Sequence, residues 1–362
     1  MGSGGKLATA YANLIKDIWI GKESDDMKRS MMINYEPKQK RIILPHNFKS
    51  TLEKYAPQFQ GYNQHDAQEL ISYLLDGMHE DLNRVKKSNN PHVEDEDCDG
   101  DCLNDDELSM QSWSNHLLRN ESIIVDLFQG QLKNTLQCNI CDYQSVKFEP
   151  FMYLSLPVAS DQEGSEKRAK SLNECLELYC KQEVLDGDNL WYCPKCSRDV
   201  SAVKKLDLWM IPPILIIHLK RFKVYTSKPP FYHYATTNRR TRVKQNHKIQ
   251  YPTNLDLSHI IQRSRTKGRK RFDRIGCICG TEPVYKLYAM LHHVGDLSSG
   301  HYTAQALNRI DNRWYDFNDS CVSELDIALD SSDDSNISSS SAYCLFYTNE
   351  EQSTPPELWP KR

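Results

Sequence analysis

The sequence Gly300-His301-Tyr302-Thr303-Ala304 is followed by Trp314-Tyr315-Asp316-Phe317-Asn318-Asp319-Ser320. Both stretches are rich in aromatic and aliphatic residues, which predicts two neighbouring strands. A histidine on one strand, with an Asn or Asp on the next, is how a Cys/His/Asn-type hydrolase orients its base. In that chemistry a thiolate attacks, the imidazole takes and returns the proton, and the third residue fixes the ring tautomer. We therefore interpret His301 as a general base, oriented by Asn318 or Asp319. The alternative is that these polar residues only cap a turn.

Two cysteine pairs, Cys138/Cys141 and Cys193/Cys196, have the spacing Cys-x-x-Cys. This spacing places two sulfur atoms on one tight turn, where both reach a metal at about 2.3 Å. Four thiolates leave no open coordination position, so we predict one structural Zn²⁺. The alternative is redox or merely buried cysteines, but a redox Cys-x-x-Cys normally opens a helix after a strand.

The rest of the chain predicts helices first and an antiparallel sheet later, an α+β class. Apolar residues from Leu7 to Ile18 recur at helical spacing, and Asp66 with Glu69 indicates a capping box that opens a second helix. We expect basic polar stretches at 237–248 and 263–274, a mobile Ser/Asp-rich loop at 331–341, and strands at 148–156, 213–222, 284–293, 301–307, 313–318 and 343–348.

Bulk composition narrows the class of protein. The chain has 362 residues, 39% of them hydrophobic, and a net charge of −4. No apolar run is long enough for a membrane span, and no secretory signal is visible, so we expect no membrane partner and a cytoplasmic or nuclear location. Twelve cysteines without a signal peptide suggest thiols and metal ligands rather than disulfides. The charge is too balanced to favour nucleic acid as a partner.

These motifs resemble the ubiquitin-specific proteases, which are papain-like cysteine deubiquitinases. The histidine box around His301 agrees, and so do the two cysteine pairs. Residues 61–70, Gly-Tyr-Asn-Gln-His-Asp-Ala-Gln-Glu-Leu, resemble the family's Gln-Gln-Asp box, with His65 where many members carry a second Gln. Residues 215–222, Leu-Ile-Ile-His-Leu-Lys-Arg-Phe, resemble a family strand motif. The resemblance extends over residues 8–348.

The resemblance implies a papain-like fold shaped like a right hand, with thumb helices, an antiparallel-sheet palm and zinc-ribbon fingers. It divides the chain into a thumb at 1–130 with an acidic insertion at 91–112, fingers and connection at 131–212, a palm at 213–350 and a tail at 351–362. It aligns Asn318 with the third catalytic residue and leaves Asp319 as a supporting residue. It implies ubiquitin and ubiquitinated proteins as partners. The substrate-binding residues it implies are Gln64, Asp66, Glu69, His293, Gly300 and Tyr302.

Particular reasons support some of these assignments. Carboxylates at Asp66 and Glu69 suit the basic tail of ubiquitin. Gly300 lets a substrate backbone approach closely. Adjacent histidines in a strand point to opposite faces, so we treat His293 as a substrate-channel residue and His292 as a surface residue.

The implied reaction is hydrolysis of the isopeptide bond after the terminal glycine of ubiquitin. The family's nucleophile box, Gly-Asn-Thr-Cys, does not occur in this sequence, whose first cysteine is Cys98. We expect the chain by itself to be inactive, with the nucleophile segment missing. The alternative is a catalytically inactive ubiquitin-binding pseudoprotease, and a more distant one is a zinc-ribbon nucleic-acid protein.

Two charged segments allow further interpretations. Asp95, Asp97, Asp99, Gly100 and Asp106 nearly match a calcium-binding EF-hand loop, but Pro91 breaks the entering helix, so we favour a solvated acidic loop. The basic residues of 263–274 are compatible with a nuclear-localisation or nucleic-acid patch, and we favour a solvated insertion.

Overall fold

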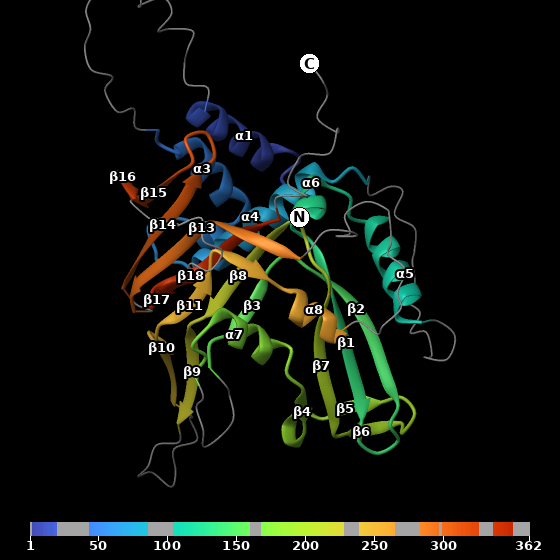
Figure 1. Ribbon diagram of the computed structural model, residues 1–362. Helices are drawn as coiled ribbons and strands as arrows, with labels where there is room; N and C mark the ends of the chain where they lie inside the picture. The colour runs from blue at the N-terminus through green and yellow to red at the C-terminus, as the bar shows by residue number, and fades with distance from the viewer. Residues whose placement is uncertain are drawn as a thin grey trace, which may run out of the picture. The chain divides into compact units, whose positions relative to one another are not determined.

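The computed structural model describes residues 2–19, 43–85, 104–159, 168–227, 239–264, 283–296, 299–325 and 336–349 (Figure 1). The chain divides into two compact units. The first contains the described residues up to 85, together with Ser122–Ile124, and the second contains the rest.

The first unit is helical. Its helices are α1 (Lys6–Trp19), α3 (His46–Tyr55), the short 3₁₀ helix η1 (Pro57–Phe59) and α4 (Ala67–Leu82). Apolar side chains at helical spacing bury one face of each helix against the others, in a cluster that contains Leu7, Leu52, Ala56 and Phe59. The predicted helices beginning near Leu7 and after Asp66 are both confirmed.

An eight-stranded sheet forms the centre of the second unit. Its main path runs β16-β15-β14-β13-β18-β8-β3, and β12 pairs with β13. All its pairs are antiparallel except β3 with β8. Its strands are β3 (Leu154–Pro157), β8 (Ile214–Lys220), β12 (Asn254–Asp256), β13 (Val284–Gly295), β14 (Gly300–Asn308), β15 (Arg313–Asn318), β16 (Cys321–Leu325) and β18 (Ala342–Thr348).

The main hydrophobic core lies against this sheet. Strand β8 is buried over most of its length, because its residues Leu215, Ile217 and Leu219 are each 0% exposed. Helix α7 (Leu172–Tyr179) adds Leu172, Cys175 and Leu176 to the same cluster, and helix α8 (Ser258–Ser264) adds Ile260 and Ile261. The core therefore packs against the middle of the sheet, and β16, next to β15, forms one edge of the sheet.

A second sheet has four strands in the order β2-β1-β7-β4. A two-stranded hairpin, β5 with β6, lies at the end of this sheet that carries Cys138 (Figure 1). The strands are β1 (Gly130–Cys138), β2 (Gln144–Phe151), β4 (Glu183–Leu185), β5 (Trp191–Cys193), β6 (Arg198–Val200) and β7 (Ala202–Met210).

Further two-stranded sheets pair β9 with β10 and β11 with β17. The remaining elements are α5 (Asp105–Leu117), α6 (Ile123–Phe128), η3 (Gly187–Asn189), β9 (Phe222–Ser227), β10 (Arg239–Lys244), β11 (Ile249–Pro252) and β17 (Asn336–Ser339). Helices and antiparallel strands in largely separate parts of the chain confirm the predicted α+β class.

Several expected boundaries were wrong. The single strand expected at 148–156 is two strands in different sheets, because the chain bends between Phe151 and Leu154. The polar stretch 237–248 contains strand β10, and the expected loop 331–341 contains strand β17. Within the segment 91–112, helix α5 begins at Asp105, where Asn104 and Glu107 form a capping box. No described helix is long and apolar enough to cross a membrane.

Candidate functional site

The structure brings His301 and Asn318 together. His301 lies at the start of β14 and Asn318 at the end of β15, the next strand of the sheet. The Nε2 atom of His301 is 2.7 Å from the Oδ1 atom of Asn318. Because an amide oxygen only accepts hydrogen bonds, Nε2 carries the proton in this contact. In the neutral ring, Nδ1 is then the nitrogen that can accept a proton from a partner.

Asp319 takes a different position from Asn318. Its Oδ2 atom is 3.9 Å from Nε2 of His301, beyond hydrogen-bond distance, and its side chain is 81% exposed. Asn318 pairs with Cys321, so Asp319 and Ser320 form the two-residue turn between β15 and β16. Asp319 has a φ of 50°, which this kind of hairpin turn requires and which Asp tolerates. Its position therefore follows from the turn, and its carboxylate adds negative charge near the imidazole.

Gly300, Tyr302 and His293 lie together next to this pair. A Cβ atom on Gly300 would be 2.1 Å from Nε2 of His293, so the ring of His293 occupies the space that a side chain there would need. From the sequence we expected a substrate backbone to approach Gly300 there, whereas in the structure the imidazole of His293 occupies this space. The ring centroids of His293 and Tyr302 are 4.6 Å apart, and His293 is only 4% exposed.

His292 is buried, so the expectation of a surface residue was wrong. Its Nδ1 atom lies 3.1 Å from Ser341 Oγ, and its Nε2 atom lies 3.2 Å from Gln305 Oε1. Gln305 in turn donates from Nε2 to Asp316 Oδ1 at 3.1 Å. Burial lowers the pKa of His292, although the hydrogen bond to Gln305 and the charge of Asp316 oppose the shift. The neutral ring is therefore the form that this site favours.

A second candidate site contains the four predicted cysteines, whose sulfur atoms all lie within 4.8 Å of one another. The Cys138 and Cys196 sulfurs are 3.9 Å apart, and those of Cys141 and Cys193 are 3.7 Å apart. These distances are far longer than a disulfide bond. They fit four thiolates around one metal ion, so the expectation that the two pairs converge on one point is confirmed.

The two cysteine turns share one local geometry. In each turn, the backbone N–H of the second cysteine points at the sulfur of the first, at 3.5 Å for Cys138 and 3.4 Å for Cys193. In each, the residue after the second cysteine has positive φ, with 56° at Asp142 and 55° at Ser197. Burial opposes ionisation of Cys138, but the N–H groups of Cys141 and Ile140 lower its pKa to about 7. Cys138 is thus readily converted to the thiolate, the form that binds a metal. Hydrogen bonding to Cys141 and burial instead raise the pKa of Cys196 to about 12.

The residues expected to bind the ubiquitin tail belong to the first unit. Asp66 is the N-cap of α4, and its side chain accepts a hydrogen bond from the Gln68 backbone at 2.8 Å. Glu69 lies in the first turn of the same helix and is exposed, as is Gln64 before it. Their side chains are therefore accessible to a partner at the start of α4.

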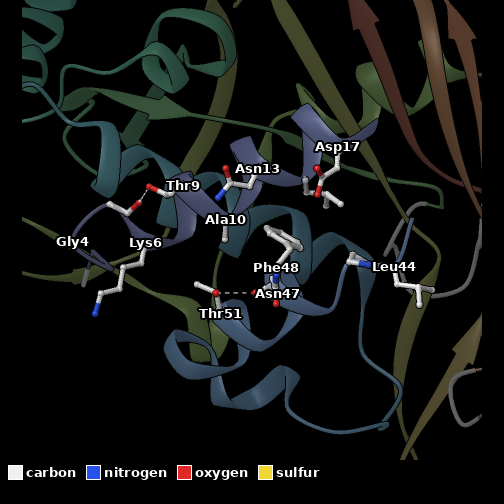
Figure 2. Close-up of a pocket in the computed structure, with 13 residues that line it drawn as sticks. Gly4, Lys6, Thr9, Ala10, Asn13, Asp17, Leu44, Asn47, Phe48 and Thr51 are labelled. Carbon is white, nitrogen blue, oxygen red and sulfur yellow. Dashed lines mark hydrogen bonds between the residues drawn. The ribbon is translucent and has the colours of Figure 1, made fainter. Parts of the chain in front are cut away.

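A cavity of about 430 Å³ lies elsewhere in the first unit, between α1 and α3. Figure 2 shows Thr9, Ala10 and Asn13 of α1 on one side, with Phe48 and Thr51 of α3 on the other. Its lining contains no cysteine or histidine. The cavity therefore lacks the thiol and imidazole groups that cysteine-type catalysis needs, and the His301–Asn318 pair remains the better candidate for the chemistry.

Sequence reasoning missed Arg221, which is 0% exposed. Its guanidinium donates to the backbone carbonyls of Ala342, Gln245, His247 and Ser339. Burial lowers the pKa of Arg221 to about 10. Its position in the 215–222 motif could have drawn attention to it. Its hydrogen-bond partners could not be predicted, because they lie in segments distant in sequence. Lys244, on β10, was also missed.

Some expectations lie outside the described residues. They include most of the EF-hand-like segment, Cys98, Cys102, Cys277 and Cys279, and most of the basic run 263–274.

Comparison with known proteins agrees over nearly the whole chain. The family model for ubiquitin carboxyl-terminal hydrolase matches residues 3–347. Ubiquitin carboxyl-terminal hydrolase 2 of Gallus gallus is 34% identical over 345 residues, covering 94% of this chain and 79% of that protein. The Bos taurus protein of the same name is 34% identical over 360 residues, covering 97% of this chain and 48% of its own length. The chain thus spans about half the length of several curated relatives it matches.

Among solved structures, the SAGA Ubp8/Sgf11/Sus1/Sgf73 DUB module bound to ubiquitin aldehyde contains a chain that matches with a TM-score of 0.55 and 21% identity. The match covers 96% of this chain and 60% of that one, and it supports the fold. With the family model matching 3–347 and a relative at 34% identity, the chain belongs to the ubiquitin-specific protease family of ubiquitin carboxyl-terminal hydrolases.

Proposed function

We propose that this chain supplies the acid–base half of a cysteine-type deubiquitinase, which hydrolyses the peptide or isopeptide bond after the C-terminal glycine of ubiquitin. The hydrogen bond of 2.7 Å between His301 and Asn318 carries the proposal. Membership of the family supports the reaction class, and the structural neighbour bound to ubiquitin aldehyde supports ubiquitin as the ligand.

The tautomer suits the chemistry. With its proton on Nε2, His301 has Nδ1 available to take the thiol proton of a cysteine. The thiolate attacks the glycine carbonyl carbon, and the C–N bond breaks as the imidazolium returns the proton to the leaving amine. Water then attacks the thioester with His301 acting again as base, which releases ubiquitin and the thiol. Asn318 keeps the ring in place throughout.

The nucleophile in this proposal is none of the eight cysteines that the structure describes, of which Cys180 is half-buried at the C-terminal end of α7. Four form the metal cluster, and Cys175 and Cys344 are both 0% exposed. Burial raises the pKa of Cys175 to about 12, which suppresses its thiolate. Cys98 and Cys102 lie among carboxylates in the sequence, and these also raise a thiol pKa.

Cys321 is exposed and is the nearest cysteine in the sheet, because it pairs with Asn318. Cys321 therefore lies next to Asn318, which contacts the Nε2 atom of His301. The nitrogen that accepts a proton in this tautomer is the other one, Nδ1. We therefore infer that the cysteine is supplied by a Gly-Asn-Thr-Cys segment outside these 362 residues.

The metal we propose is zinc, held by Cys138, Cys141, Cys193 and Cys196. A site made only of thiolates at these distances selects a soft or borderline metal, and a closed set of four indicates a structural role. Bound there, zinc would tie the turn after β1 to the β5–β6 hairpin.

A second candidate function is ubiquitin binding without hydrolysis. It is favoured because none of the cysteines that the structure describes is a suitable nucleophile. Both functions need the tail of ubiquitin to be recognised, and we propose Asp66 and Glu69 for this task. Titration of the chain with ubiquitin tests it. We expect Glu69→Lys to weaken binding at least about tenfold, because like charge then faces the arginines of the tail. Asp17→Lys, at an exposed position of α1, is the matched control and should bind like the parent. Equal affinity of all three proteins would reject the assignment.

A further inference from the structure

The backbones of β13 and β14 approach each other closely just before His301. Gly295 ends β13 and pairs with Gly300, the first residue of β14. Gly295 has a φ of +103°, and a Cβ there would lie 2.4 Å from the backbone oxygen of Ser299. The N–H of Asp296 donates to that same oxygen at 2.9 Å. Only glycine therefore fits at Gly295 without moving the turn.

The ring of His293 fills the space over Gly300. Its Nε2 atom would be 2.1 Å from a Cβ on Gly300, and its Cε1 atom 2.7 Å. The ring is packed between aromatic side chains, with centroids 5.4 Å from Phe222 and 4.6 Å from Tyr302. The backbone N–H of His293 donates to Ser341 at 2.8 Å. Neither the ring nor its backbone can shift without moving these neighbours, so Gly300 rests on a fixed surface.

A lysine from another strand holds the same turn through the backbone. The Nζ atom of Lys244, on β10, donates to the carbonyl of His293 at 2.7 Å and to that of Gly295 at 2.9 Å. One ammonium group thus binds two backbone carbonyls at the C-terminal end of β13. Hydrogen bonds from a charged donor are stronger than neutral ones, so this contact is suited to fixing a backbone position.

We propose that His293 and Lys244 are positioning residues for His301. The His293 imidazole packs against Gly300, and the Lys244 ammonium holds the carbonyls on either side of Val294 by hydrogen bonds. His301 directly follows Gly300, and its pairing partner in β13 is Val294. A displacement of Gly300 therefore moves the His301 ring away from Asn318, and misplacement of about 1 Å is enough to reduce catalysis strongly.

This inference rests on the proposed role of His301, but its test does not require hydrolysis. NMR of the chain labelled with ¹⁵N in the histidine rings reports which nitrogen of His301 carries the proton. In the parent protein we expect the Nε2–H form. Gly300→Ala should shift His301 toward a mixture of tautomers, because the new methyl group meets the His293 ring. Adding His293→Ala to Gly300→Ala removes that clash and should restore the parent spectrum.

Lys244 gives a second test in which misfolding is less of a concern. Lys244→Met keeps the apolar stem and removes the ammonium, so it should also increase the mixture of tautomers, whereas Lys244→Arg should retain most of the parent spectrum. Lys220→Met, at an exposed position of β8, is the matched control and should change nothing.

The outcomes separate the two proposals. The positioning role is overturned if Gly300→Ala and Lys244→Met both fold and leave the His301 signals unchanged. It is also overturned if the double variant regains thermal stability without regaining the tautomer, since His293 would then be only a packing residue. If the NMR results are as expected but hydrolysis by the enzyme does not depend on His301, the proposed function fails and the positioning relationship stands.

Discussion

The Oδ1 atom of Asn318 lies 2.7 Å from the Nε2 atom of His301, whereas the Oδ2 atom of Asp319 is 3.9 Å from it. An amide therefore makes the orienting hydrogen bond, and the carboxylate acts on the ring only through its charge. This arrangement fixes the tautomer of His301 without a directly bonded anion to stabilise the imidazolium.

Asn318 is expected to matter through orientation more than through charge. In an active protein, Asn318→Ala should lower kcat/KM by about 10²-fold, because the ring loses its fixed tautomer. Asn318→Asp keeps an acceptor at the same place and should retain more activity. Its added negative charge should stabilise the imidazolium that His301 becomes during the reaction. An Ala variant as active as the Asp variant would contradict the orienting role.

The cysteine cluster predicts one zinc ion per chain. Cys193→Ser should remove the metal and lower the melting temperature, because the binding free energy of a structural zinc contributes to folding. Cys180→Ser, a half-buried cysteine outside the cluster, is the control and should retain the metal. Elemental analysis together with thermal unfolding measures both effects. Full zinc content in Cys193→Ser would exclude this site.

Asp81 is predicted to stabilise the start of α1. Its carboxylate accepts hydrogen bonds from the backbone of Ser3 at 2.7 Å, of Leu7 at 3.1 Å and of Ala8 at 3.2 Å. Partial burial opposes ionisation, but hydrogen bonds from Ser3, Gly5 and Ala8 outweigh it and lower the pKa of Asp81. Such a cap near a helix N-terminus is worth about 1 kcal/mol.

Because the pKa is lower in the folded state, this stabilisation is complete above the unfolded value of 3.8 and is lost as the pH falls below it. Asp81→Asn should therefore speed amide hydrogen exchange at Leu7 and Ala8 at pH 6–7 by about fivefold, since about 1 kcal/mol corresponds to that factor. The difference should shrink near pH 3. Asp17→Asn, at the other end of α1, should not slow or speed exchange at these two amides. Equal exchange in parent and Asp81→Asn at neutral pH would contradict the cap.

His292 also predicts a loss of stability on acidification, but here the fold favours the neutral form of the group. Burial lowers its pKa, as does the positive charge of Arg221, against the opposing effects of Gln305 and Asp316. The unfolded chain then binds the proton more readily, so the stabilisation is complete above about pH 6.5 and is lost as the pH falls through that value. His292→Gln should reduce the fall in stability between pH 7.5 and 5, as measured by denaturant unfolding. An unchanged slope would show that His292 titrates normally.

The sequence predicted the features whose signals are local. Two Cys-x-x-Cys turns, the cap at Asp66 and the strand rich in aromatic and aliphatic residues around His301 each depend on neighbouring residues, and the structure contains all three features. Strands β10 and β17 were missed because their residues are largely polar, and the pairing partner of β17, strand β11, is also distant in sequence. Strand pairing of this kind depends on tertiary context rather than on intrinsic preference.

The supporting interactions were missed for the same reason. The two ring nitrogens of the buried His292 find hydrogen-bond partners in Ser341 and Gln305, and these residues come from other segments. Arg221 is buried because backbone carbonyls of several segments accept its hydrogen bonds. Gly300 is required by the ring of His293, a partner that the motif itself does not reveal.

The most direct measurement is labelling by a ubiquitin probe that carries a thiol-reactive group at its C-terminus. We expect the 362-residue chain to be labelled negligibly, and the same chain preceded by a Gly-Asn-Thr-Cys segment from a family member to be labelled rapidly. His301→Ala in that longer protein should abolish rapid labelling. Rapid labelling of the chain alone, or unchanged labelling after His301→Ala, would contradict the assignment of His301 as the base of a deubiquitinase whose nucleophile lies outside this sequence.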